Sequence, residues 1–360
     1  MPVIWSAISG HGYGHAAQVV PVLNELGRLI PNLKTILRST VPASFFRDRL
    51  TISWNLQSVQ QDVGCIQHGP LEIDVPATWE AHVQFHEEWE RRMTDEVTAI
   101  RVASPNIILA DTPYLAAAAG KEAGVPVVAL ANFTWIEALQ PFADSTQPRH
   151  QAILETMRHS YGHAKLALRV APGLPLSALL NVVDIGPITE TVPSRRAEIR
   201  KQLGVKESEQ LVLLAFGGIP LETLPWEKIE QMRGYHFIVN TPPNRASSRI
   251  HVNSTIPHSF STLMASVDLI MTKPGYGTIV EAVALGTPVV YVRRYNFADE
   301  APLVEFLHHY GRGHELSLVD FTAGNWQPAF DAIRWIQPSV IPPPITGAAD
   351  AARLLAPYIQ

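Results

Sequence analysis

Three consecutive patterns at the start of the chain encode a strand, a glycine-rich turn and a helix. Residues 3–8 are an apolar run, residues 10–15 read Gly-His-Gly-Tyr-Gly-His, and apolar residues then recur at helical spacing over 19–30. Glycine allows positive φ and the close approach of another molecule. A helix that begins at such a turn directs its unpaired N–H groups toward that molecule. We therefore predict a ligand-binding strand–turn–helix unit near the N-terminus.

The turn differs from the fingerprint of dinucleotide-binding proteins. Its glycines follow the order Gly-x-Gly-x-Gly, and no acidic residue suited to a ribose stands at 37–40, after the second apolar run. A nicotinamide or flavin cofactor is therefore not expected. His11 and His15 add two groups that titrate near neutral pH. Either they serve chemistry, or they lie on the surface of a tight turn.

Short apolar runs alternate with helical patterns along the whole chain. The runs that we predict as strands cover 3–8, 35–39, 107–110, 125–131, 164–168, 211–216, 236–239, 269–271 and 288–292. Such alternation is typical of parallel sheets covered by helices on both faces. Because 360 residues exceed what one core usually holds, we expect two Rossmann-like, doubly wound α/β domains that face each other across a cleft.

A polar stretch that contains prolines, 184–200, marks the expected domain boundary. We predict an N-terminal domain over 1–185 and a C-terminal domain over 186–340. Three prolines at 342–344 then interrupt the chain before a helical pattern at 347–358. The segment 341–360 is therefore predicted to end in a helix that packs back on the first domain.

Composition limits the expected partners. The net charge of −5, with 46% hydrophobic and 17% charged residues, gives no reason to expect nucleic acid as a partner. A single cysteine, Cys65, permits no disulfide within the chain and fits a reducing cytoplasm. The N-terminus lacks a signal-peptide pattern, and no apolar run reaches the roughly 18 residues of a membrane span. We expect a cytoplasmic location and leave peripheral membrane contact and the oligomeric state open.

A second glycine turn follows the apolar run at 269–271. Its residues, 272–278, read Thr-Lys-Pro-Gly-Tyr-Gly-Thr and lead into a helical pattern. Amide groups at such a helix start hold phosphate oxygens, and a lysine adds positive charge. The residues that we expect to do so are Lys273, Gly275, Tyr276, Gly277 and Thr278. Glu281 follows within the helix, where it either binds both hydroxyls of a ribose or complements the helix dipole.

Two further strand ends carry candidate ligand-binding residues. The strand at 211–216 ends in Gly217 and Gly218, where a ligand can approach the backbone. The strand at 288–292 ends in Arg293, and Asp299 and Glu300 follow after a short loop. The two carboxylates either accept hydrogen bonds from sugar hydroxyls or form the acidic first turn of the next helix.

Together these motifs resemble two-domain glycosyltransferases of the GT-B fold. Residues 272–294 resemble the nucleotide-sugar segment of the MurG-type N-acetylglucosaminyltransferases and the UDP-glycosyltransferases. The chain is also similar to the glycosyltransferase-like region that precedes the kinase domain of plant L-arabinokinases. The pieces that match are 10–15, Asp111, 132–135, 216–218, 273–278 and 293–300. Since the kinase domain lies outside this resemblance, we expect no sugar-kinase activity.

The resemblance implies roles for particular residues. In UDP-glycosyltransferases a histidine of the first loop deprotonates the acceptor hydroxyl, and an aspartate orients that histidine. We carry this pair over to His11 and Asp111, with His15 as the rival base. We expect the nucleotide sugar to bind to the residues of the second turn, together with Glu281, Gly217, Gly218, Arg293, Asp299 and Glu300. On the acceptor side we expect Gly10, Gly12, Tyr13, Gly14, Asn132, Phe133 and Trp135, of which the two aromatic residues alternatively belong to the core.

The implied activity is an inverting, metal-independent transfer of sugar from a nucleotide-diphosphate sugar, most simply a UDP-sugar, to a hydroxyl acceptor. No bound cofactor and no metal are expected, and the chain has no Asp-x-Asp motif. His82 and His86 stand four residues apart but have no third ligand at a fixed spacing, so we expect a solvated helix face there. Base and phosphate turn lie in different domains, so reaction would require the cleft to close. Two alternatives stay open: a nucleotide-sugar 2-epimerase of the same fold, and a nucleotide-sugar-binding protein without catalysis.

Overall fold

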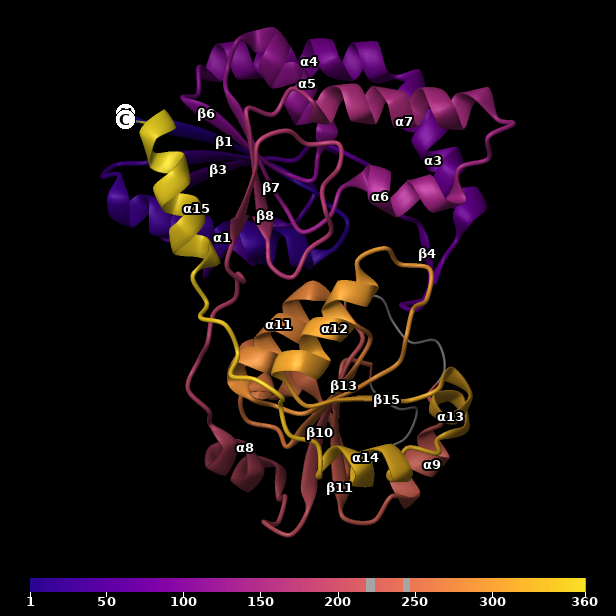
Figure 1. Cartoon of the computed structure of the whole chain (residues 1–360). Helices are drawn as coiled ribbons and strands as arrows, with labels where there is room; N and C mark the ends of the chain where they lie inside the picture. Colours follow the sequence, from indigo (N-terminus) through magenta and orange to yellow (C-terminus); the bar gives the residue numbers. More distant parts are fainter. Residues whose placement is uncertain (218–223, 242–246, 360) are drawn as a thin grey trace. The chain divides into compact units, whose positions relative to one another are not determined.

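The computed structural model of the chain describes residues 1–217, 224–241 and 247–359. It divides into two compact units (Figure 1). Unit 1 contains residues 1–66, 73–189 and 344–360, and unit 2 contains residues 67–72 and 190–343. The chain therefore passes from the first unit to the second close to the polar stretch identified in the sequence, and it returns to the first unit at residue 344.

Unit 1 is built on a seven-stranded sheet in the order β3-β2-β1-β6-β7-β8-β9. Every neighbouring pair in this sheet is parallel. The central strands are buried along their whole length because helices cover both faces. The strands are β1 (Val3–Ile8), β2 (Lys34–Arg38), β3 (Ser53–Gln57), β6 (Ile107–Asp111), β7 (Val127–Ala131), β8 (Leu166–Val170) and β9 (Val182–Ile185).

Helices of unit 1 lie on both sides of this sheet. Figure 1 shows α4, α5 and α7 on one side of the strands and α1 on the other, with α15 beside α1. The helices are α1 (Tyr13–Leu29), α2 (Ala43–Arg47), α3 (Val75–Glu87), α4 (Trp89–Ala103), α5 (Tyr114–Ala123), α6 (Trp135–Leu139), α7 (Pro148–Tyr161) and α15 (Gly347–Leu355), with the short 3-10 turns Gln140–Phe142 and Ala356–Tyr358.

The last helix, α15, joins unit 1 through close backbone contact. Its first residue, Gly347, donates a hydrogen bond to the Pro187 carbonyl at 3.1 Å. A Cβ on Gly347 would lie 2.1 Å from the carbonyl oxygen of Gly186, so only glycine allows this approach. Asp350 accepts a hydrogen bond from the Gly186 amide at 3.3 Å, which fixes the helix to the end of β9.

Unit 2 is built on a six-stranded parallel sheet in the order β12-β11-β10-β13-β14-β15. Its strands are β10 (Gln210–Ala215), β11 (Tyr235–Val239), β12 (Ile250–Val252), β13 (Leu269–Thr272), β14 (Val289–Tyr291) and β15 (Gly313–Glu315). The short strands β4 (Gln67–His68) and β5 (Glu72–Ile73) pair with each other, and Leu71 between them packs against the core of this unit.

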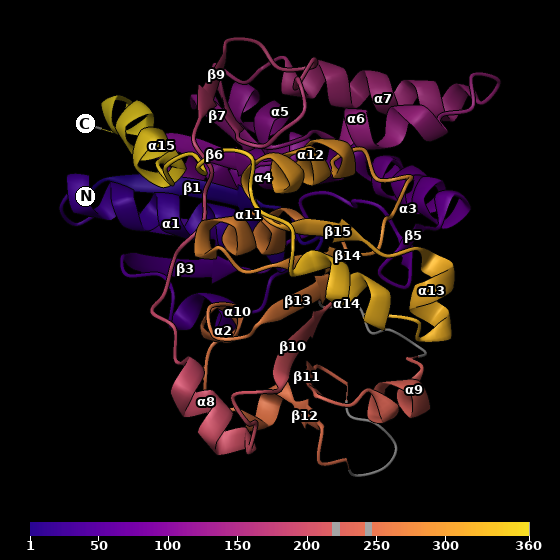
Figure 2. The ribbon, with the colours of Figure 1, turned by 60° about the horizontal axis from the view of Figure 1, so that its bottom comes forward.

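The helices of unit 2 connect its strands in the usual α/β manner. Figure 2 shows α14 against β14 and β15, and Figure 1 shows α11 next to α12. The helices are α8 (Arg196–Leu203), α9 (Trp226–Gln231), α10 (Phe260–Met264), α11 (Tyr276–Leu285), α12 (Glu300–Tyr310), α13 (Leu318–Ala323) and α14 (Gln327–Ile333), with a 3-10 turn at Asn253–Thr255. The two parallel sheets confirm the predicted α/β class. Within the described residues, no helix has the length and apolar character required to cross a membrane.

Candidate functional site

The first glycine turn is shaped by a close approach between neighbouring strands. A Cβ on Gly10 would lie 1.9 Å from Oγ1 of Thr40, which follows the adjacent strand β2. Gly12 precedes α1 with a φ of 93°, a conformation that favours glycine. Tyr13 opens α1 and stacks on Phe45 of α2, with ring centroids 5.3 Å apart. Gly14 lies in the first turn of the helix. The turn thus carries the chain from the edge of the sheet directly into α1.

His15 and Asp111 form a buried pair at this edge. His15 lies in the first turn of α1, Asp111 ends β6, and His15 Nδ1 is 3.0 Å from Asp111 Oδ1. Thr112 has a φ of 65° and places its hydroxyl 3.3 Å from the same nitrogen. Burial raises the pKa of Asp111, and His15 opposes that rise. With Asp111 ionised, Nδ1 donates to the carboxylate and the imidazole lone pair lies on Nε2.

The structure pairs Asp111 with His15, whereas the resemblance to UDP-glycosyltransferases implied a pair with His11. The reason lies in where the helix begins. His15 is helical, so its side chain lies on the face of α1 that packs toward the sheet, while His11 precedes the helix in the turn. The His11 ring instead contacts the edge of Trp135, with centroids 5.3 Å apart and planes at 88°. The geometric pairing is corrected, and the catalytic roles of both histidines remain predictions.

The loop after β7 brings three predicted acceptor-side residues to the same edge. Asn132 accepts a hydrogen bond from Gln18 of α1 at 3.3 Å. The rings of Phe133 and Trp135 lie 5.8 Å and 6.1 Å from the ring of His15. Trp135 is fully buried and begins α6, which Thr134 caps. The aromatic residues therefore form the wall around the histidines.

Asp62 also belongs to this cluster, although no sequence motif predicted it. It lies in a stretch without regular structure, yet it is buried and accepts hydrogen bonds from Ser9 at 3.0 Å and from Trp135 Nε1 at 2.8 Å. Burial raises its pKa to about 6, although Trp135, His15 and Ser9 favour the charged form. No periodic pattern surrounds the residue, so only tertiary contacts reveal it.

His82 and His86 do not form the solvated helix face that we predicted. His82 is buried and its Nε2 lies 2.9 Å from the carbonyl oxygen of Gly64. His86 Nε2 lies 3.0 Å from the hydroxyl of Tyr114. Burial lowers the pKa of each histidine to about 4, so both are neutral at pH 7. In the part of the chain that the structure describes, no group of three or more His, Cys, Asp and Glu side chains is arranged to hold a metal ion.

In unit 2, Lys273 lies between two glycine turns. A Cβ on Gly217 would be 3.6 Å from Lys273 Cε, and one on Gly275 would be 3.5 Å from Nζ. Gly217 has a φ of 82°, whereas Gly218 lies outside the described residues. Burial lowers the pKa of Lys273 to about 7, Arg294 adds to this effect, and Asp299 and Glu300 oppose it. The ammonium group is thus held at the end of β13, where α11 begins.

Helix α11 presents its N-terminus at this point, with Gly275 as its cap and Tyr276, Gly277 and Thr278 in its first turn. Tyr276 is buried, and no acidic residue occupies that first turn. Glu281 is the sixth residue of the helix, whereas the stabilising effect of the dipole falls off within the first turn. Of the two roles left open for Glu281, complementing the dipole is therefore the weaker.

Glu300 is engaged by two arginines that follow β14. Its Oε1 accepts from Arg293 Nε at 2.9 Å, and its Oε2 accepts from the Arg294 backbone amide at 2.6 Å. Glu300 is fully buried and is the first residue of α12. Asp299 precedes the helix and bonds Arg294 at 3.3 Å. The geometry thus favours the acidic first turn, the alternative that the sequence left open for Glu300.

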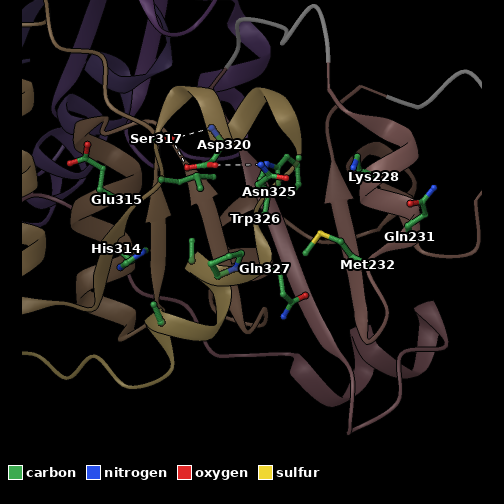
Figure 3. A pocket seen from close by; sticks show the side chains of 15 residues that line it. Lys228, Gln231, Met232, His314, Glu315, Ser317, Asp320, Asn325, Trp326 and Gln327 are labelled. Atoms are coloured by element: carbon green, nitrogen blue, oxygen red, sulfur yellow. Dashed lines mark hydrogen bonds between the residues drawn. The ribbon is translucent and has the colours of Figure 1, made fainter.

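A wide hollow of about 790 Å³ also lies in unit 2, lined by α9, β15, α13 and α14 (Figure 3). None of the predicted donor residues lines it. Ser317 bonds Asp320 at 2.6 Å, and Asp320 accepts from Asn325 at 3.5 Å. Ser317 and Asp320 therefore serve the N-terminus of α13, where Ser317 is the cap.

No family model matches the chain. It is 26% identical over 339 residues to an L-arabinokinase of Arabidopsis thaliana, and the match covers 92% of this chain. The match covers 32% of that relative, so the chain spans about a third of its length.

Solved structures of glycosyltransferases share the fold. The glycotransferase of kitacinnamycin has a TM-score of 0.66 at 13% identity, covering 99% of this chain and 94% of the other. UGT2 of Phytolacca americana, complexed with UDP-2fluoro-glucose and pterostilbene, has a TM-score of 0.61 at 13% identity, with coverage of 99% and 94%. The chain therefore has the GT-B fold, as its motifs predicted.

Proposed function

We propose that the protein is a glycosyltransferase that moves a sugar from a nucleotide-diphosphate sugar to a hydroxyl acceptor. The observation that carries this proposal is the buried pair of His15 and Asp111 at the carboxyl edge of the seven-stranded sheet. In open α/β sheets, ligands bind outside the carboxyl ends of the strands. An imidazole at such an edge, oriented by a carboxylate, is the arrangement that a poor hydroxyl nucleophile requires.

In this proposal His15 is the general base. It removes the proton of the acceptor hydroxyl through Nε2, while Asp111 holds the tautomer and stabilises the imidazolium that forms. The acceptor oxygen attacks the anomeric carbon as the bond to the diphosphate breaks, which gives inversion. His11 remains the rival base, since it lies on the same aromatic wall but without the bond to Asp111.

In this proposal unit 2 binds the diphosphate leaving group. Lys273 and the N–H groups at the start of α11 supply positive charge for the developing phosphate charge, and the mechanism therefore needs no metal. We assign the ribose to Glu281 and a sugar hydroxyl to Asp299. A UDP-sugar is the donor that we favour, because UGT2 of Phytolacca americana was crystallised with UDP-2fluoro-glucose.

The two alternatives make different demands on the site. A 2-epimerase that works by elimination needs several carboxylates around the sugar, and Glu300 is already bonded to two arginines. A binding protein without catalysis does not need the oriented imidazole of His15. Both alternatives predict nucleotide-sugar binding, so turnover with an acceptor separates them from the proposal.

The test is thermal unfolding with UDP, GDP, dTDP, CDP, ADP and their sugars, followed by an assay of nucleotide release with pooled hydroxyl acceptors. A ligand at 100 times its Kd adds about 2.7 kcal/mol of stability, so selective binding is easily seen. We expect stabilisation by UDP compounds and acceptor-dependent release of UDP. Absence of stabilisation by every nucleotide contradicts the proposal. So does phosphorylation of L-arabinose by ATP, which the name of the Arabidopsis relative makes a necessary control.

A further inference from the structure

Asp62 is a buried carboxylate for which the proposed mechanism has no role. Its side chain uses both oxygens, Oδ1 toward the Ser9 hydroxyl and Oδ2 toward the Trp135 indole. Ser9 follows β1 and Trp135 begins α6, so the carboxylate joins two elements far apart in the sequence. Burying a charge is costly unless it is well hydrogen-bonded. A carboxylate retained at such a place therefore invites a functional explanation.

Both hydrogen-bond donors to Asp62 also contact His11. The Ser9 hydroxyl that donates to Asp62 also accepts a hydrogen bond from the His11 backbone amide at 3.2 Å. The Trp135 ring that donates to Asp62 meets the His11 ring edge to face, at 5.3 Å. Asp62 thus reaches the backbone of His11 through one partner and its imidazole through the other.

The segment that carries Asp62 also covers the His11 ring directly. Gly64 has a φ of 77°, and a Cβ there would lie 2.5 Å from His11 Nδ1. Only a glycine allows the backbone to pass so close to the imidazole. The Gly64 carbonyl is in turn bonded to His82 of α3. Residues 62–64 and Trp135 therefore enclose His11 from two sides.

We propose that Asp62 is a positioning residue, which holds the turn and the imidazole of His11 in place beside the pair of His15 and Asp111. The positioning itself stands without the proposed function, whereas its consequence for catalysis rests on the proposed glycosyl transfer. A carboxylate that accepts from an indole and a hydroxyl binds both more strongly when ionised. Protonation of Asp62 should therefore loosen both contacts to His11.

The charged and titratable groups around Asp62 come from four elements. His15 of α1 lowers its pKa, while Asp111 of β6 raises it. Tyr114 of α5 and Tyr161 of α7 also face the carboxylate, but burial raises the pKa of each hydroxyl well above 10, so they stay neutral. Asp62, with a pKa of about 6, is thus expected to titrate in this cluster near that pH. The imidazoles of His11 and His15 lie against the same indole, so a titration of the Trp135 resonance is assigned to Asp62 only by its loss in Asp62→Asn.

The experiment follows the indole N–H resonance of Trp135 in the 15N-labelled, full-length protein, assigned with Trp135→Phe. In the wild type we expect this resonance to titrate with a midpoint near pH 6. In Asp62→Asn the titration should be lost, and the His11 ring resonances, assigned with His11→Gln, should shift. Asp144→Asn is the matched control, because Asp144 is an exposed carboxylate of the same unit that bonds Thr146. It should leave both signals unchanged.

Two further variants keep the proposal testable if Asp62→Asn fails to fold. Ser9→Ala removes one donor to the carboxylate, so the Trp135 midpoint should move to higher pH. Gly64→Ala should shift the His11 resonances and leave the Trp135 titration in place. His11 resonances that do not shift in Asp62→Asn overturn the proposal. If that variant does not fold, a Trp135 midpoint that does not rise in Ser9→Ala overturns it. None of these measurements needs a nucleotide sugar, so their outcome is independent of the assay for glycosyl transfer.

Discussion

The imidazole of His15, in the first turn of α1, lies 3.0 Å from the carboxylate of Asp111, which ends β6. The strand that leads into α1, β1, is the parallel neighbour of β6. In their register Ile8 is opposite Asp111, and the Ser9 amide donates a hydrogen bond to the Asp111 carbonyl at 3.3 Å shortly before α1 begins. The second histidine of the turn is therefore the one that meets the carboxylate. This relationship makes His15 the first residue to test.

Removing the His15 imidazole should abolish most glycosyl transfer without weakening the binding of the nucleotide-sugar donor. We expect His15→Ala to lower kcat by about 10²–10⁴-fold, the usual contribution of a general base. Thermal stabilisation by UDP should persist, because the proposed phosphate turn belongs to unit 2. Release of UDP from a UDP-sugar measures the first quantity. His11→Ala is the comparison. If kcat falls further in that variant than in His15→Ala, His11 is the general base.

Substitution of Asp62 should change how stability depends on pH. Its pKa is raised from 3.8 to about 6, so the folded protein binds this proton more tightly than the unfolded chain does. The ionised carboxylate therefore costs stability as pH rises from about 4 to about 6, with an upper bound near 3 kcal/mol. Relative to the wild type, Asp62→Asn should gain up to that amount between pH 4 and pH 7. Denaturant unfolding at both pH values measures the difference, and a constant difference would contradict the raised pKa.

Binding of a diphosphate should drive proton uptake by Lys273. The free protein holds this group at a pKa of about 7, and a bound phosphate favours its charged form. At pH 8 the lysine should therefore gain a proton when UDP binds, and affinity should fall from pH 7.5 to pH 8.5. Calorimetry in buffers of different ionisation enthalpy measures the uptake. Lys273→Gln should weaken UDP binding and abolish the uptake, whereas Lys228→Gln, at an exposed lysine of the same unit, should change neither.

The two adjacent carboxylates at the start of α12 should respond differently to substitution. Glu300→Gln leaves Arg293 and Arg294 without their buried partner and should lower the free energy of unfolding by about 3 kcal/mol. Asp299→Asn should cost less than about 1 kcal/mol but weaken binding of a UDP-sugar relative to UDP. Denaturant unfolding and titration with both ligands separate these effects. Equal destabilisation by the two variants would contradict the structural role of Glu300.

Glu281 should distinguish ribose from its deoxy analogue. If the carboxylate binds both ribose hydroxyls, the wild type should prefer UDP to 2′-deoxy-UDP, and Glu281→Ala should lose that preference. Each lost hydrogen bond to a charged group is worth about 1.5–3 kcal/mol, so the effect should be at least tenfold in Kd. If Glu281→Ala leaves the ratio of the two dissociation constants unchanged, Glu281 does not bind the ribose.

The sequence predicted the interior strands of both sheets and missed the outer ones. The interior strands β1, β6 and β10 are continuous apolar runs, because helices cover both of their faces. Within the two large sheets, the strands that escaped prediction are the outermost ones, β3, β9, β12 and β15. The two-residue strands β4 and β5, which pair with each other, also escaped prediction. β3 is largely polar and partly exposed, and β12 and β15 have three residues each, so neither periodicity nor length marks them.

Site residues were predictable where a motif and a strand end coincide. Both glycine turns, Asp111 and Lys273 follow apolar runs, and the structure places each at the carboxyl end of a strand or at the turn after it. The partner of Asp111 depended on whether α1 starts before or after His11, and helix boundaries are the least certain part of such predictions. Asp62 lies in an irregular segment, so its contacts with Ser9 and Trp135 have no counterpart in the local sequence.

The path of the chain has a consequence for its synthesis. Unit 1 is assembled from residues 1–66, 73–189 and 344–360, and α15 packs on α1. The ribosome must therefore complete residues 190–343 before the helix that covers α1 becomes available. The unit whose translation begins first is the later of the two to be completed. Until then the face of α1 that receives α15 lacks its partner, which leaves that surface of the nascent chain open to aggregation or chaperone binding.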